Sequence, residues 1–114
     1  MKDFKNKVAL ITGAGSGIGR ALALELAESG CSLALLDWNE DSLSETEQML
    51  KKKNIAVSSH ILDVSEKEKV KDLPNQVLSH HNRIDLVFNN AGLSIVGTVD
   101  EVDEDDWNFG LDIL

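Results

Sequence analysis

One glycine-rich segment restricts the fold of this chain more than any other feature. It joins a run of apolar residues to a segment whose apolar residues have the spacing of a helix. The apolar run at 8–11 leads directly into Thr12-Gly13-Ala14-Gly15-Ser16-Gly17-Ile18-Gly19, and apolar residues at four-residue spacing follow at once. Gly-x-Gly-x-x-Gly is a weak signal by itself, but between a strand and a helix it is typical of a βαβ unit. A parallel sheet is therefore the first prediction.

Four apolar runs predict the strands of this sheet. They are rich in β-branched residues or leucine and lie at 8–11, 33–36, 55–57 with 61–62, and 84–88. Their apolar residues mostly follow one another instead of alternating with polar ones, which is typical of strands covered on both faces. We therefore expect helices on each side of the sheet.

Helical periods separate the strands. Three of them carry one stripe of mostly apolar residues: Ile18, Leu22 and Leu26; Leu43, Thr46 and Leu50; and Val70, Leu73 and Val77. The first should end at Ser29-Gly30, because glycine readily adopts the left-handed conformation that ends helices. The third should open with a capping box at Ser65 and be kinked at Pro74. A fourth is expected from near Glu104.

The alternation of strands and helices predicts the architecture. Right-handed crossovers produce a doubly wound, Rossmann-like α/β fold with four parallel strands in the order 3-2-1-4 and helices on both faces. One domain over 1–114 is predicted, because 114 residues with 42% hydrophobic content suffice for one modest core.

Charge and composition exclude several classes of function. Twenty acidic and eleven basic side chains give a net charge of −9, which disfavours binding to nucleic acid or to anionic membranes. No apolar stretch approaches the roughly 20 residues that cross a bilayer, and the N-terminus lacks a signal-peptide pattern, so we expect a cytoplasmic location. Cys31 is the single cysteine, and no metal site is predicted. The acidic residues at 100–106 are interpreted as a solvated loop and helix start.

The glycine loop predicts a phosphate-binding site. Glycine permits the tight turn, lets the backbone approach a pyrophosphate closely, and leaves N–H groups at a positive helix end. A merely flexible turn would not need glycines at 13, 15, 17 and 19 and a threonine at the strand end. The predicted contacts are Gly13, Ser16, Gly17, Ile18 and Gly19.

Three motifs in order resemble the short-chain dehydrogenase/reductase family. Thr12 with Gly13, Gly17 and Gly19 has the spacing of its glycine motif, Asn89-Asn90-Ala91-Gly92 after the fourth strand is similar to its second signature, and Asp63-Val64 follows the third strand. The resemblance covers nearly the whole chain. It implies the N-terminal, NAD(P)-binding Rossmann part of an oxidoreductase that transfers hydride between the nucleotide and an alcohol or carbonyl substrate.

The family resemblance also implies roles for the later motifs. Asp63 is expected to hydrogen-bond the adenine amino group, and Val64 to flank the ring. Asn89 is expected to brace the strands. The ribose and nicotinamide path is implied to be lined by Asn90, Ala91 and Gly92.

Asp37 is expected to select between the two nicotinamide cofactors. It ends the second strand, 18 residues beyond Gly19, where a carboxylate can accept hydrogen bonds from the adenosine ribose hydroxyls but would repel a 2′-phosphate. The two usual positions for a compensating cation hold Ser16 and Trp38, so the predicted cofactor is NAD. Two alternatives stay open: Asp37 could only cap the helix that begins near Glu40, and Trp38 could border the adenine or be a surface aromatic.

No catalytic residue is predicted in these 114 residues. His60 lies in an apparent edge strand and His80 and His81 at a helix end, where a structural or surface role is favoured. The resemblance implies a catalytic Ser and Tyr-x-x-x-Lys beyond the second signature, but the chain contains no tyrosine, and Leu114 stands where the family has an asparagine.

The 114 residues are therefore expected to be a truncated, inactive unit that retains cofactor binding. A non-catalytic dinucleotide-binding module and a fragment that binds nothing are the alternatives. A homo-oligomer is possible, and the substrate is left open.

Overall fold

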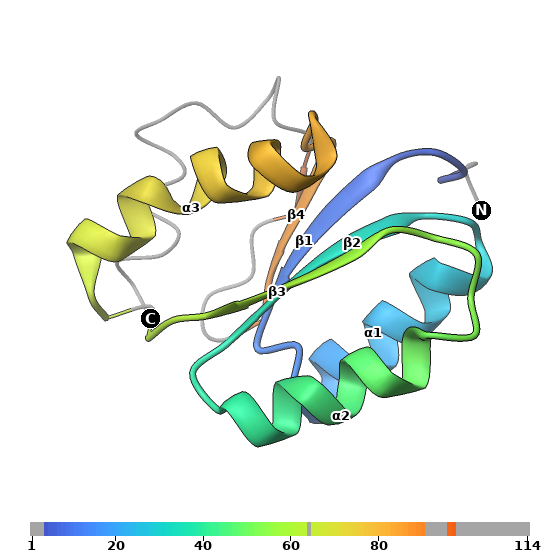
Figure 1. The fold of residues 1–114 in the computed structure, drawn as a ribbon, viewed down its shortest axis with the longest axis horizontal. Coiled ribbons are helices and arrows are strands. Elements are labelled where there is room, and N and C mark those ends of the chain that lie inside the picture. Colours follow the sequence, from blue (N-terminus) through green and yellow to red (C-terminus); the bar gives the residue numbers. More distant parts are fainter. Residues whose placement is uncertain (1–3, 64, 91–95, 98–114) are drawn as a thin grey trace.

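The computed structural model of the protein describes residues 4–63, 65–90 and 96–97, and its first four strands alternate with three helices along the chain (Figure 1). The elements are β1 (Val8–Thr12), α1 (Gly17–Glu28), β2 (Ser32–Asp37), α2 (Glu40–Leu50), β3 (Val57–Ile61), α3 (Lys67–His81), β4 (Leu86–Asn89) and β5 (Val96–Gly97). The predicted fourth helix lies outside the described residues. Within the described part, no helix is long and apolar enough to span a membrane.

The sheet has the order β3-β2-β1-β4-β5, so the predicted order 3-2-1-4 is confirmed. The first four strands are parallel, whereas β5 runs antiparallel to β4 and pairs Val96 with Phe88 and Gly97 with Val87. This fifth strand was not predicted, because two residues are too short for a periodic pattern.

Helices cover both faces of the sheet, with α1 and α2 on one side and α3 on the other (Figure 1). Alternate residues of β1 supply the two cores. Ala9 and Ile11 belong to the core beneath α1 and α2, and Leu10 belongs to the core beneath α3. The consecutive apolar residues of the inner strands are therefore explained, because successive side chains point to opposite faces and both faces are buried.

Two details of the helix predictions are wrong. Ile18 is 76% exposed, because the buried face of α1 is formed by residues 19, 23, 26 and 27 and so begins one position later. Ser65 does not cap α3: the helix begins at Lys67, and the Ser65 N–H donates to Asp63 Oδ1 (2.9 Å) in the preceding turn. The helix continues past Pro74 to His81. The predicted end of the first helix is confirmed, with Gly30 in the left-handed region (φ 81°).

Three histidines gather between the edge strand β3 and the end of α3. Ser58 Oγ lies 2.8 Å from Nε2 of His60 and 2.8 Å from Nε2 of His81, and the His60 and His80 rings meet edge to face at 5.6 Å. A serine hydroxyl donates one hydrogen and accepts two, so at most one of the two Nε2 atoms accepts from Ser58 and the other must donate an N–H to it. Burial lowers the pKa of His60 and of His81, and repulsion by His80 lowers both further.

This cluster predicts a loss of stability in mild acid. The unfolded chain protonates these histidines near their ordinary pKa of 6.5, whereas the folded protein resists the proton. The free energy of unfolding should therefore keep its whole contribution from these histidines above about pH 6.5, and it should decrease as the pH drops below that value. Urea unfolding between about pH 7.5 and pH 5 measures this slope, and replacing His60 and His81 together by Gln should flatten it. A wild-type stability that is constant or rises toward pH 5 contradicts the prediction.

Candidate functional site

The candidate site lies at the carboxyl edge of the sheet, between β1 and β4, where the strand order reverses. Open α/β sheets bind ligands at such a reversal. Thr12 at the end of β1 is paired with Asn89 at the end of β4. Thr12 Oγ1 donates to Asn89 Oδ1 (3.0 Å) and accepts the Asn90 N–H (2.9 Å). Asn89 thus joins the two strand ends, in agreement with the bracing role expected for it.

Each of the four loop glycines is explained by backbone conformation or by close packing. Gly13 and Gly17 have positive φ angles of 65° and 57°, which L side chains rarely adopt. A Cβ at Gly19 would lie 2.0 Å from the Gly13 oxygen, and one at Gly15 would lie 2.8 Å from Asp37 Oδ2. At Gly17 a Cβ would meet nothing within 4 Å, so conformation rather than space requires glycine there.

The N-terminus of α1 is suited to bind an anion. Its N-cap residue, Ser16, makes no side-chain capping hydrogen bond, whereas the N-cap of α2, Asn39, accepts the Ser42 N–H (3.0 Å). The side chains of Ser16 and Ile18 are exposed, as is Gly17. The N–H groups of the first turn and the positive end of the helix dipole therefore favour a negatively charged group here.

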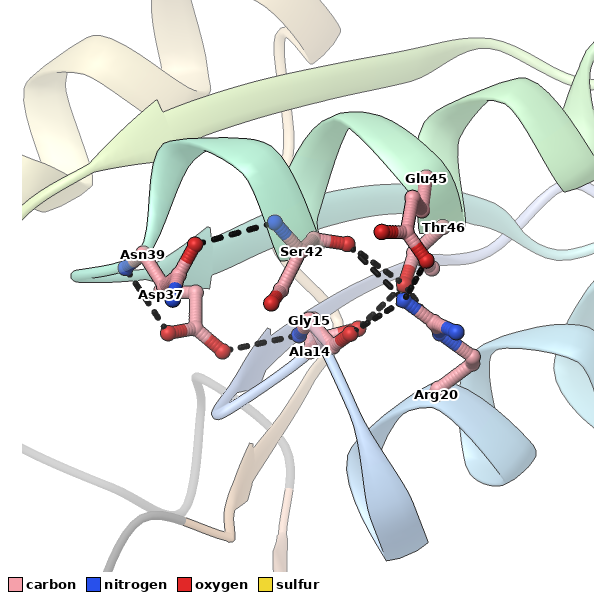
Figure 2. A network of polar contacts seen from close by, with 8 residues as sticks. All are labelled: Ala14, Gly15, Arg20, Asp37, Asn39, Ser42, Glu45 and Thr46. Atoms are coloured by element: carbon pink, nitrogen blue, oxygen red, sulfur yellow. Dashed lines mark hydrogen bonds and ion pairs between the residues drawn. The ribbon is translucent and has the colours of Figure 1, made fainter.

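The Asp37 carboxylate lies directly beside the glycine loop. Its Oδ2 accepts the Gly15 N–H (2.8 Å) and its Oδ1 accepts the Asn39 N–H (3.1 Å), as Figure 2 shows. Because Asn39 is the N-cap of α2, the alternative in which Asp37 only caps that helix is wrong. Trp38 is 71% exposed, which suits either of the roles left open for it.

The remaining predicted residues are only partly described. Asn90 Nδ2 would lie 3.0 Å from a Cβ at Gly19, which places its side chain against the start of α1. Asp63 is exposed after β3, and hydrogen bonds from the Ser65 backbone and hydroxyl lower its pKa. Val64, Ala91 and Gly92 lie outside the described residues.

Sequence reasoning missed Arg20, which extends from α1 across the loop to α2. Its Nη2 donates to the Gly15 oxygen and its Nε donates to Thr46 Oγ1 (2.8 Å) (Figure 2). No sequence pattern indicated these partners, because they depend on how α2 packs against α1. In the described part of the chain, no group of three or more His, Cys, Asp or Glu side chains could hold a metal ion.

Known proteins that are similar to this chain include several dehydrogenases. A meso-2,3-butanediol dehydrogenase of Serratia marcescens is 39% identical over 112 residues, which are 96% of this chain and 44% of that protein. The crystal structure of an NAD⁺-bound xylitol dehydrogenase is 42% identical with a TM-score of 0.76, over 81% of this chain and 35% of that one. A short-chain dehydrogenase/reductase of Burkholderia phymatum in complex with NAD is 39% identical with a TM-score of 0.76, over 97% of this chain and 40% of that one.

The chain thus spans between 35% and 44% of the length of these proteins. The family profile described as short chain dehydrogenase matches residues 7–113. The glycine loop, the Asp37 position and the Asn89-Asn90 strand end all lie within that match. The chain belongs to the short-chain dehydrogenase family.

Proposed function

We propose that this chain binds NAD at the carboxyl edge of β1 and β4, as the cofactor-binding part of an oxidoreductase that moves hydride between NAD and an alcohol or carbonyl substrate. One observation carries the proposal. The Asp37 carboxylate is held on the glycine loop by the Gly15 N–H, next to the open N-terminus of α1. The Asp37 carboxylate, which can accept hydrogen bonds from ribose hydroxyls, therefore lies beside the N-terminus of α1, which can bind phosphates. The proposed setting is the cytoplasm, where NAD is available.

The residues present fit the parts of this cofactor. The pyrophosphate would be held by the backbone at Gly13 and at 16–19. Asp37 would accept hydrogen bonds from the adenosine ribose hydroxyls, and Asp63 and Val64 would border the adenine. The path toward the nicotinamide would be lined by Asn90, Ala91 and Gly92. Two similar structures are NAD complexes, which supports NAD as the nucleotide.

NAD is proposed rather than NADP because of charge. A 2′-phosphate on the ribose would face the Asp37 carboxylate, and the nearby positions 16 and 38 offer Ser and Trp instead of a cation. Like charges at contact distance disfavour binding even when they are partly solvated.

The first test of the proposal is the ratio of the two cofactor affinities. Calorimetric titration should show NAD binding tighter than NADP by on the order of 10- to 100-fold, or about 1.4 to 2.8 kcal/mol. Asp37→Ala combined with Trp38→Arg should narrow or invert that ratio, because it removes the repulsion and adds a cation. Equal or tighter binding of NADP by the wild-type protein defeats the NAD assignment.

The second test is a pair of alanine substitutions in the loop. Gly19→Ala should abolish NAD binding and lower stability, because its Cβ cannot lie 2.0 Å from the Gly13 oxygen. In Gly17→Ala the added Cβ meets nothing within 4 Å. This variant should lose about 1–2 kcal/mol of stability, because alanine is strained at the left-handed φ of 57°. Calorimetry and urea unfolding measure both effects. If Gly19→Ala keeps wild-type affinity and stability, the loop is not the phosphate site.

A non-catalytic binding module is the second candidate, because the contacts described at the glycine loop and Asp37 are those of a binding site. Reduction of a carbonyl requires a positioned proton donor, which typically raises the reaction rate by roughly 10²- to 10⁴-fold. Asp37 and Asp63 would lie at the adenosine end of the proposed site, too far from the nicotinamide to serve.

We expect these 114 residues alone to bind NADH without oxidising it in the presence of a panel of ketones and aldehydes. Absorbance at the NADH band follows the reaction. Oxidation that scales with protein concentration and disappears in Gly19→Ala would assign chemistry to the chain itself.

A further inference from the structure

We propose that Arg20 is a positioning residue for the adenosine end of the site. It ties the glycine loop to the first turns of α2 and so keeps Gly15 against the Asp37 carboxylate. The inference rests on the proposed NAD site, and it assigns a specificity role to a side chain that does not itself touch the cofactor.

The Arg20 guanidinium meets a set of oxygens from two elements. Nη2 donates to the backbone oxygens of Gly15 and Ser42, the latter at 3.0 Å, and Nε donates to Thr46 Oγ1 at 2.8 Å. Glu45 Oε1 lies 3.5 Å from Nη2. Only 24% of the Arg20 side chain is exposed, so water competes weakly for these charge-assisted bonds.

A second link runs parallel to the first. The buried Thr46 hydroxyl donates to the Ala14 oxygen (2.8 Å), while its oxygen accepts the Arg20 Nε–H. Two consecutive loop carbonyls, those of Ala14 and Gly15, are thereby fixed by one buried threonine and one arginine. The loop cannot shift relative to α2 without breaking several of these bonds.

Gly15 is held from both sides. Its oxygen accepts from Arg20, and its N–H donates to Asp37 Oδ2 at 2.8 Å. A Cβ at this position would lie 2.8 Å from Asp37 Oδ2 and 2.9 Å from the Ser42 Cβ, so loop, carboxylate and α2 are packed without spare room. Displacement of Gly15 would therefore break one of the two hydrogen bonds that hold the carboxylate proposed to select NAD, and leave only the one from the Asn39 N–H.

The position of the guanidinium excludes a direct role in binding a 2′-phosphate. Figure 2 shows Arg20 and Asp37 on opposite sides of Gly15. To reach a phosphate beside Asp37, Arg20 would have to abandon its carbonyl partners. Lysine cannot replace it, because one ammonium nitrogen cannot serve acceptors that the planar guanidinium reaches from two separate nitrogens.

The experiment compares Arg20→Met and Arg20→Lys with the wild-type protein. Calorimetric titration with NAD and with NADP should show NAD affinity at least about tenfold weaker in both variants, with NADP affinity changed less, so that the ratio between them falls. Val70→Ala is the control, because it removes core volume beneath α3 on the other face of the sheet. It should lower stability and leave the ratio unchanged.

The exchange rate of the Gly15 amide hydrogen in the ligand-free protein provides a second readout, independent of cofactor binding. It should rise in Arg20→Met and not in Val70→Ala. If the Arg20 variants do not fold, Thr46→Val, which keeps the side-chain shape but removes the hydroxyl, should raise the same rate and lower the same ratio.

Equal loss of both cofactors, full rescue by Arg20→Lys, or unchanged Gly15 exchange would each overturn the positioning role. A wild-type protein that binds neither cofactor would instead refute the proposed function. The amide exchange would then still decide whether Arg20 holds Gly15 in place.

Discussion

The close approach of α1 to the glycine loop is the constraint on which the rest of the site depends. The Gly19 Cα lies so near the Gly13 carbonyl that a Cβ would be 2.0 Å from its oxygen. This contact brings the N-terminus of α1 to the end of β1, where the reversal of strand order opens the edge of the sheet. The helix end and the edge of the sheet therefore coincide because position 19 carries no side chain.

The site relies on backbone groups rather than on cationic side chains. The chain carries a net charge of −9, yet the first turn of α1 offers N–H groups and a helix dipole to an anion. The nearest arginine, Arg20, is engaged by oxygens of the loop and of α2. A carboxylate, Asp37, lies against the same loop at Gly15, where it accepts the Gly15 N–H. This distribution of charge supports the proposal of a pyrophosphate at the helix end and of neutral ribose hydroxyls, without a second phosphate, near Asp37.

Much of the fold was predictable because its signals are local. Consecutive apolar residues in β1 and β2 indicated burial on both faces, and the two separate cores confirm it. Errors arose where a local pattern competed with packing. Ser65 has the spacing of a capping box, but its N–H is bonded to Asp63 and the helix starts two residues later. Ile18 has the period of the buried stripe, but the small residues at 19 and 23 face the sheet instead.

The sequence by itself determined the order of the first four strands and of the three helices between them, the place of the glycine loop and the residue at the end of β2, because periodicity and glycine conformation act over a few neighbouring residues. Only the tertiary structure decided which groups meet. Asp37 and Gly15 are 22 residues apart, Arg20 and Thr46 are 26 apart, and Thr12 and Asn89 are 77 apart. Such contacts depend on the relative placement of whole elements in the sheet, which no local pattern encodes.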